Sequence, residues 1–209
     1  KPRLKGTDGN AREIIYLTIP EMDRLRACQI PDNQKHLEQT RDVFLFCCYT
    51  SLRYSDVAAL KVEDVKEGYI TVVTQKTSDG LKIELNRHAQ AIIDKYHGKR
   101  FRGDRALPVI SNQKMNDYLK ELGRMAGIDA PTRVVYFRGE QRFDEYHPKW
   151  ELLTTHCARR TFVVTALQLG IPVEVIIRWT GHSSYEAMKP YVAIVDDLKK
   201  KEMDKFNAL

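Results

Sequence analysis

The chain has 209 residues, of which 43% are hydrophobic and 30% are charged. This composition is typical of a globular domain with a sizeable buried core, and it excludes disordered, collagen-like and low-complexity chains. Lys and Arg number 34 against 28 Asp and Glu, which gives a formal net charge of +6. A surplus of this size permits a polyanionic partner but does not require one.

The hydrophobic segments and the cysteines predict in which compartment the protein is found. The longest apolar run, Val43–Tyr49, is far shorter than the roughly 20 residues that span a bilayer, and the basic start of the chain does not resemble a signal peptide. We therefore expect a cytoplasmic protein with no membrane partner. The cysteines are not spaced as zinc ligands or as a disulfide framework, so we expect reduced, mostly buried thiols at positions 28, 47, 48 and 157.

The first part of the chain is predicted to be a basic tether followed by helices. Basic residues without apolar periodicity predict a tether, or the remnant of an interdomain linker, over residues 1–15. Thr18 and Glu21 have the spacing of a capping box, which predicts a first helix over residues 19–28. Apolar residues at helical spacing predict further helices over residues 33–50, 55–60, 87–97 and 112–125.

Two β-hairpins are predicted between these helices and beyond them. Residues 69–75 are rich in β-branched and aromatic residues and residues 82–85 alternate, with Ser78-Asp79-Gly80 as the turn between them. Residues 133–146 alternate around Gly139-Glu140 and predict a second, more exposed hairpin.

The C-terminal third is predicted to be helical. Helices are expected over residues 156–169, from residue 172 onward, over 185–192 and over 194–206. Pro190 is expected to kink or delay the helix that carries Tyr191. Because the chain has no internal repeat and no Gly/Ser-rich linker, the pattern predicts one mainly α domain with a small antiparallel β-sheet, an α+β fold.

The common nucleotide and hydrolase motifs are missing, and a different polar group stands out. The chain has no Gly-rich phosphate loop, no His-Glu-x-x-His helix and no Gly-x-Ser-x-Gly elbow. In the segment Thr-Ser-Leu-Arg-Tyr-Ser-Asp, Arg53 follows an apolar helix and Asp56 lies three residues later, where it can orient the arginine.

A second polar group follows in the C-terminal third. His156 and Arg159 are three residues apart and so share one helix face or its first turn, while His182, preceded by Gly, lies nine residues before Tyr191. In this order, the two groups together resemble the catalytic domain of the tyrosine recombinases. This is the phage-integrase family of site-specific DNA strand-exchange enzymes.

The resemblance extends from residue 16 to the C-terminus and implies the tyrosine recombinase catalytic-domain fold over residues 16–209. The family's N-terminal DNA-binding domain is expected to be absent from this chain. Three features depart from the family pattern. Ser51 stands where the family usually has Gly, Asp56 stands where it usually has Glu, and Met188-Lys189-Pro190 precedes Tyr191. The implied function is site-specific DNA recombination of the integrase type, as for a mobile element, through a 3′-phosphotyrosyl intermediate and without ATP, cofactor or metal.

The resemblance also implies which residues act on the scissile phosphate. Arg53 and Arg159 are expected to clamp its nonbridging oxygens, because guanidinium forks match phosphate geometry. Tyr191 is expected to be the nucleophile, since its phenol can form a covalent phosphotyrosyl bond. Tyr185 and Tyr49 are rival tyrosines, but only Tyr191 has the nine-residue offset from the Gly-His pair.

Proton transfer and positioning are assigned to the remaining residues of the pattern. Lys76, in the first hairpin, is expected to protonate the leaving 5′ oxygen, with Lys82 across the hairpin as its rival. His156 is expected to accept the phenol proton or to position the phosphate, and His182 to hydrogen-bond a nonbridging oxygen. Asp56 is expected to orient an arginine.

The expected partners follow from this resemblance, and two other functions stay open. Double-stranded DNA is the expected partner, with a tetramer on paired DNA sites, a monomer without DNA as an alternative, and accessory DNA-bending proteins. Such a protein would be associated with the nucleoid. The alternatives are a nicking and closing activity like that of type IB topoisomerases and a DNA-binding module that does not react.

Overall fold

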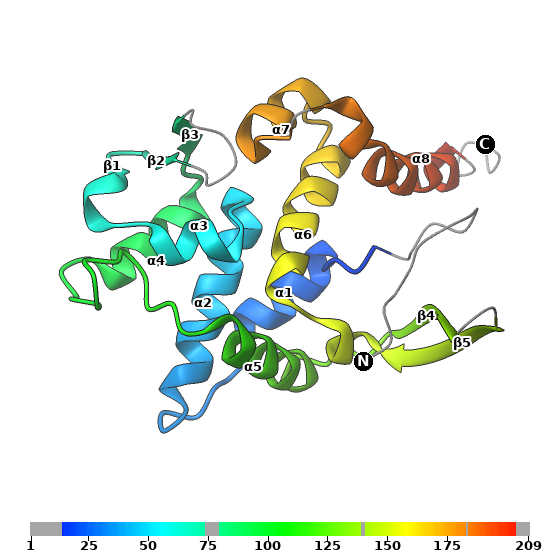
Figure 1. Ribbon diagram of the computed structural model, residues 1–209, viewed down its shortest axis with the longest axis horizontal. Helices are drawn as coiled ribbons and strands as arrows, with labels where there is room; N and C mark the ends of the chain where they lie inside the picture. Colours follow the sequence, from blue (N-terminus) through cyan, green and yellow to red (C-terminus); the bar gives the residue numbers. More distant parts are fainter. Residues whose placement is uncertain (1–13, 74–79, 139–140, 183, 204–209) are drawn as a thin grey trace.

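Two long helices form the centre of the molecule. The computed structural model describes residues 14–73, 80–138, 141–182 and 184–203. Helices α2 (Lys35–Thr50) and α6 (Thr155–Gln168) lie against each other at the centre, and the other elements surround them (Figure 1). This arrangement confirms the predicted fold class, a mainly α structure with small antiparallel sheets. In the described part of the chain, no helix has both the length and the apolar character needed to cross a membrane.

The remaining helices agree closely with the prediction up to residue 180. They are α1 (Ile19–Ala27), α3 (Tyr54–Ala59), α4 (Arg87–Tyr96), α5 (Asn112–Met125), α7 (Val173–Thr180) and α8 (Lys189–Met203), with 3₁₀ turns η1 (Val62–Asp64), η2 (Lys149–Leu152) and η3 (Tyr185–Ala187). The predicted capping box of α1 is present: the Glu21 carboxylate accepts a hydrogen bond of 2.7 Å from the Thr18 backbone N–H, and the Thr18 hydroxyl accepts one from the Glu21 N–H.

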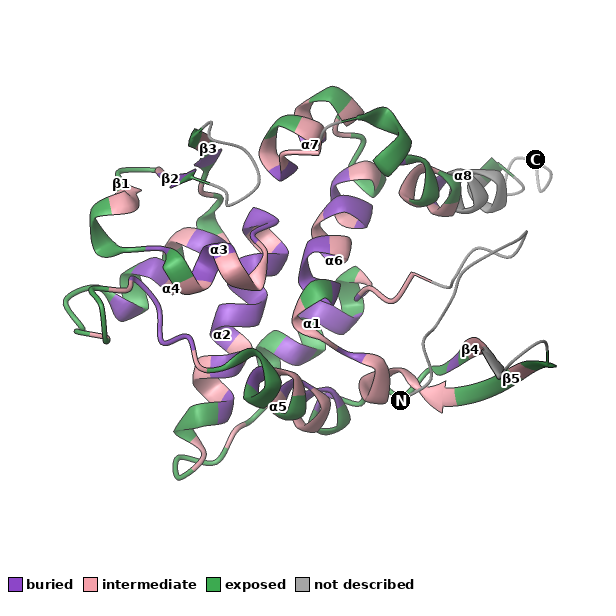
Figure 2. Ribbon diagram, viewed as in Figure 1, coloured by how far each residue is buried: buried purple, intermediate pink, exposed green. Residues whose placement is uncertain are grey.

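The strand pairings of both predicted hairpins are confirmed, whereas Ser78-Asp79 and Gly139-Glu140 of their predicted turns lie outside the described residues. The first is part of an antiparallel sheet of β1 (Val65–Lys66), β2 (Tyr69–Val73) and β3 (Gly80–Glu84), in that order. Strand β1 was not predicted, because two residues are too few to show alternation. The second hairpin pairs β4 (Pro131–Arg138) with β5 (Gln141–Pro148), extends away from the body and is largely exposed (Figures 1 and 2).

The prediction for the C-terminus was wrong in one respect. In place of helices over 185–192 and 194–206, the structure has the short turn η3 and a single helix, α8, that begins at Lys189. Pro190 falls in the first turn of α8. A proline is tolerated there because the N–H that it lacks would have no partner within the helix. The proline therefore marks the start of the helix that carries Tyr191 and does not interrupt it.

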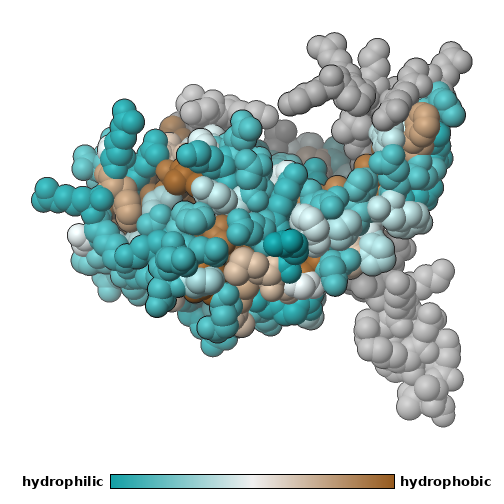
Figure 3. Space-filling view, turned by 90° about the horizontal axis from the view of Figure 1, so that it is seen from below, coloured by the Kyte–Doolittle hydropathy of each residue, from teal (hydrophilic) through white to brown (hydrophobic). Residues whose placement is uncertain are grey.

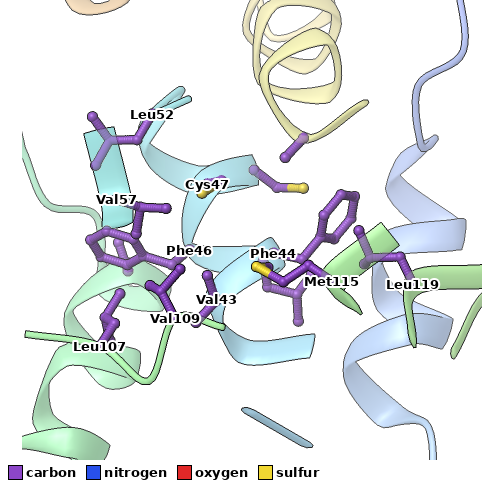
Figure 4. Close-up of a cluster of buried hydrophobic side chains, with 14 of the residues drawn as sticks. Val43, Phe44, Phe46, Cys47, Leu52, Val57, Leu107, Val109, Met115 and Leu119 are labelled. Atoms are coloured by element: carbon purple, nitrogen blue, oxygen red, sulfur yellow. The ribbon is translucent and has the colours of Figure 1, made fainter. Parts of the chain in front are cut away.

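The hydrophobic core is built around α2. Phe44 lies beside Met115 of α5, whereas Phe46 lies on the side of Val57 and Leu107 (Figure 4). Helices α2 and α6 carry much of the buried surface (Figure 2), while the face seen in Figure 3 is largely hydrophilic with scattered apolar side chains. Of the four cysteines, all free thiols, three are buried and Cys28 is half-buried, as predicted.

A close contact between α5 and η2 sets the position at which α6 begins. A Cβ atom at Gly123 would lie 2.7 Å from Leu153 Cδ1 and 2.8 Å from Trp150 Cβ. Side chains cannot approach so closely, so only glycine lets η2 pack on α5 at this point. Because η2 leads directly into α6, this packing fixes the start of the helix that carries His156 and Arg159.

We predict that Gly123→Ala lowers the free energy of unfolding by about 1–3 kcal/mol, because the added methyl group displaces η2. Urea denaturation of the purified chain measures this change. The matched control is Gly80→Ala, where the nearest heavy atom to the new Cβ, Thr71 Cγ2, is 3.8 Å away. Equal stability of the two variants would contradict the close packing.

Candidate active site

The side chain of Arg159 joins the ends of two helices in the interior. It is 4% exposed. Its Nη1 donates to the Ser51 carbonyl at the C-cap of α2, at 3.1 Å, and its Nη2 donates to the Thr180 carbonyl, the last of α7. The last carbonyls of a helix have no partner within it and carry partial negative charge, which favours a cation at this position. The guanidinium thus holds the C-terminal ends of α2 and α7 together.

Ser51 adopts a left-handed backbone conformation, with φ of +63°, where α2 ends. This region favours glycine, which accounts physically for the glycine expected at this position from the family pattern. The serine offsets the strain with a hydrogen bond, since its Oγ donates to the Trp179 carbonyl at 3.2 Å. The turn directs the Ser51 carbonyl toward Arg159 and sends the chain on to Arg53.

Arg53 and Asp56 are joined at the start of α3. Asp56 Oδ2 accepts a hydrogen bond of 3.1 Å from the Arg53 backbone N–H and lies 3.9 Å from Arg53 Nη1. The Asp56 side chain is buried, whereas that of Arg53 is 30% exposed. The carboxylate is therefore placed to fix both the first turn of α3 and the direction of the guanidinium, which keeps access to solvent.

His182 is bound at both ring nitrogens. Its Nδ1 lies 2.7 Å from the Thr180 hydroxyl and its Nε2 lies 3.3 Å from Arg159 Nη2. Burial, followed by the charges of Arg159 and Arg53 and by His156, lowers the pKa of His182 to about 4. The ring is therefore neutral at pH 7.

His156 lies at the exposed edge of the same group, in the first turn of α6. Loss of water from part of its ring, and then the charges of Arg160, Arg159 and Arg53, lower the pKa of His156. Helix α5 fixes this end of α6, because Asn116 Oδ1 accepts from the Thr155 backbone N–H at 2.9 Å.

Tyr191 lies in the first turn of α8, half-buried against a small second cluster that includes Val163, Ile176 and Met188. The phenol is within electrostatic reach of Arg159, and a negative charge on its oxygen would favour the charged guanidinium. Burial and the charge of Arg53 outweigh this effect and lower the pKa of Arg159 to about 10.

Helix α7 also supports the β-sheet. The Trp179 indole Nε1 donates to Glu84 Oε2 of β3 at 2.9 Å, and a Cβ atom at Gly181 would lie 3.1 Å from Leu81 Cδ1. Trp179 is half-buried and lines an apolar cavity of about 540 Å³ together with Phe162. Ile176 of α7 is fully buried.

Most of the predicted site residues thus come together. Hydrogen bonds and mutual electrostatic effects link Arg53, His156, Arg159 and His182, with Tyr191 in reach of Arg159. Lys76 lies outside the described residues. The described part of the chain has no cluster of three or more His, Cys, Asp or Glu side chains that could hold a metal ion. A concentration of cationic and neutral donors such as this one suits a phosphate group.

Thr180 is a site residue that the sequence analysis missed. It is fully buried, its carbonyl accepts from Arg159 and its hydroxyl contacts His182. The signal was a polar residue at the end of the apolar α7, directly before the Gly-His pair.

The comparison with known families agrees with the geometry. The model of the phage integrase family matches residues 17–197. The chain belongs to this family. It is 24% identical over 174 residues to the tyrosine recombinase XerC of Treponema denticola, covering 80% of this chain but only 56% of that protein.

Two solved structures have the same fold. The catalytic domain of bacteriophage HP1 integrase matches 87% of this chain and 88% of its own length, with 19% identity and a TM-score of 0.58. A lambda integrase (75–356) dimer bound to a COC′ core site matches 90% of this chain and 60% of its own, with 18% identity and a TM-score of 0.61.

We predict that His182 makes the free energy of unfolding rise with pH between about 4 and 6.5. The unfolded chain binds a proton at this histidine near pH 6.5, whereas the folded chain binds it only near pH 4. The contribution is complete above pH 6.5 and is lost as the pH falls through this window.

Comparison of the wild type with His182→Asn by urea denaturation at several pH values checks this prediction. The stability of the wild type relative to the variant should decrease as the pH falls from 7 to 4. His97→Asn, at an exposed position on the C-cap of α4, is the control for loss of an imidazole. A constant difference between wild type and His182→Asn would show that the pKa is not lowered.

Proposed function

We propose that residues 16–209 form the catalytic domain of a site-specific DNA recombinase of the integrase type, which cuts and rejoins DNA through a phosphotyrosyl bond to Tyr191. The observation that carries this proposal is the convergence of Arg53, His156, Arg159 and His182, with Tyr191 close enough to interact electrostatically with Arg159. Family membership and the match to an integrase catalytic domain support it.

The proposed reaction exchanges one phosphoester for another. The Tyr191 oxygen attacks the scissile phosphorus, its proton passes to His156, and the 5′ oxygen leaves with a proton from Lys76. The lowered pKa of His156 leaves its ring neutral and able to accept a proton near pH 7. Arg53 and Arg159 bind the nonbridging oxygens, with Asp56 orienting Arg53. Rejoining reverses these transfers, so the chemistry requires no ATP, metal or cofactor.

The proposed substrate is double-stranded DNA. The protein is proposed to bind paired DNA sites as a tetramer, with accessory proteins that bend the DNA. The net charge of +6 and the cationic site suit a polyanion, and the lambda integrase of similar fold was crystallised as a dimer on its core site. Because phosphate contacts dominate such binding, affinity is expected to fall steeply with salt. We place the protein in the cytoplasm, on the nucleoid.

We predict that the chain forms a denaturant-resistant covalent adduct with nicked suicide DNA at low salt and that Tyr191→Phe forms none, because the variant lacks the nucleophilic oxygen. Gel electrophoresis under denaturing conditions measures the adduct. Tyr185→Phe, which removes the hydroxyl of a tyrosine that is 50% exposed on η3, is the matched control and retains the adduct.

The same assay separates the alternative functions. An adduct in both Tyr191→Phe and the wild type, or in neither, would contradict the proposal, and the second result favours a DNA-binding module. Two differently labelled duplexes distinguish recombination from nicking and closing, because only recombination joins strands from different duplexes.

We predict that Lys76→Ala slows cleavage of ordinary DNA by roughly 10²- to 10⁴-fold, the usual contribution of a general acid. DNA in which sulfur replaces the 5′ bridging oxygen should restore the rate, because a thiolate leaves without a proton. Single-turnover cleavage of the two substrates measures this. The control is Lys82→Ala. In the wild type, the Nζ of Lys82 lies 4.2 Å from the centre of the Tyr69 ring. If Lys76→Ala slows cleavage of both substrates equally, Lys76 is not the general acid. If the sulfur-containing DNA instead restores the cleavage rate of Lys82→Ala, Lys82 is the general acid.

A further inference from the structure

The Thr180 hydroxyl lies between the last turn of α7 and the ring of His182. It is 2.7 Å from the Ile176 carbonyl, one helical turn earlier, and 3.3 Å from the Ile177 carbonyl, to which it can donate, and it contacts His182 Nδ1 at 2.7 Å. The side chain is fully buried at the end of α7. A hydroxyl has one proton to donate and lone pairs with which to accept, so its bond to the carbonyl determines what it offers to the ring.

The hydrogen bonds around His182 are consistent with only one placement of its proton. A guanidinium has donors and no acceptor, so Arg159 Nη2, 3.3 Å from Nε2, requires a lone pair on that nitrogen. In a neutral imidazole the proton is then on Nδ1. It is donated to the Thr180 hydroxyl, which in turn donates to the Ile176 carbonyl. Each donor in this series of hydrogen bonds, from Arg159 to the Ile176 carbonyl, therefore has an acceptor.

We propose that Thr180 is a positioning residue that holds His182 in the Nδ1–H tautomer when no phosphate is bound, with Nε2 accepting from Arg159. The charged and titratable groups that act on the ring are Arg159 and His156 from α6 and Arg53 from the turn before α3. All three disfavour the doubly protonated ring, which would also place an N–H against an N–H of Arg159.

The proposal has a consequence that rests on the proposed function. To donate to a phosphate oxygen, His182 needs its proton on Nε2. The Thr180 hydroxyl permits this change, because it can rotate away from the Ile176 carbonyl and donate to Nδ1. One proton leaves Nδ1 for water and another reaches Nε2 from water, so the net charge is unchanged. Thr180 thus supports an acceptor state of the histidine toward Arg159 and a donor state toward phosphate.

The tautomer can be measured directly in the DNA-free chain. Two-bond ¹H–¹⁵N correlation spectra at pH 7 distinguish a protonated ring nitrogen from one with a lone pair, and His182→Asn identifies the His182 signals among those of six histidines. We expect protonated Nδ1 and unprotonated Nε2 in the wild type. An Nε2–H ring in the wild type overturns the proposal, whether or not any variant folds.

Substitutions of Thr180 test whether its hydroxyl is the cause. Thr180→Ser keeps the hydroxyl and should keep the Nδ1–H tautomer, whereas the isosteric Thr180→Val should shift the ring toward Nε2–H or a mixture. The matched control is Thr40→Val, at a buried threonine whose hydroxyl also bonds the carbonyl one turn earlier, that of His36 at 2.8 Å. An unchanged tautomer in Thr180→Val would show that the hydroxyl does not set it.

Cleavage of suicide DNA gives a second readout. Thr180→Val should lower the single-turnover rate by up to about a hundredfold at saturating DNA, with DNA affinity unchanged, and Thr180→Ser should restore it. A wild-type rate in Thr180→Val overturns the consequence for catalysis. If the wild type forms no adduct, the proposed function fails while the tautomer result stands, so the two failures are distinguishable.

Discussion

The arrangement of this site depends on one buried guanidinium. Arg159 is nearly inaccessible to water and is stabilised by the carbonyls of Ser51 and Thr180, where α2 and α7 end. A buried cation is tolerated only when such acceptors surround it. The requirement to satisfy this charge therefore fixes the relative positions of three helices, and the side chains that follow each helix end, Arg53 and His182, come with them.

Burial and positive charge together determine the state of the histidines. Loss of water lowers the pKa of both His156 and His182, and the charges of Arg159 and Arg53 lower it further, because an added proton would be poorly solvated and would bring like charges together. The same field attracts an anion. Before any phosphate is bound, the site therefore combines permanent cations with neutral imidazoles, one of which is exposed and can accept a proton.

Local sequence signals predicted most of the fold. The bounds of α5 and the capping box of α1 follow from apolar spacing and from one Thr-Glu pair, and these features depend on neighbours within a few residues. Strand β1 was missed because its two residues are defined only by pairing with β2. Of the two expected effects of Pro190, a kink or a delay, the structure has the delay, since the helix begins only at Lys189; the effect of a proline depends on whether a helix has already begun.

Prediction of the site depended on an ordered pattern and not on local physics. Arg53, His156, Arg159, His182 and Tyr191 were found from their spacing and order along the chain, and all five interact directly or electrostatically with another member of the group. The pattern could not identify Thr180, because a threonine at the end of a helix is ordinary until a ring and a guanidinium are placed beside it. Asp56 was correctly placed beside Arg53, but its backbone hydrogen bond was visible only in three dimensions.

Helix α7 has two attachments whose combination matters. The Trp179 indole is bound to Glu84, and Leu81 lies so close to Gly181 that a larger residue would displace it. Strand β3 and the segment that carries His182 therefore both contact the same short helix. A substitution in β3 that shifts α7 would also shift His182, so the side chains at this edge of the sheet can change during evolution only where the position of the histidine is kept.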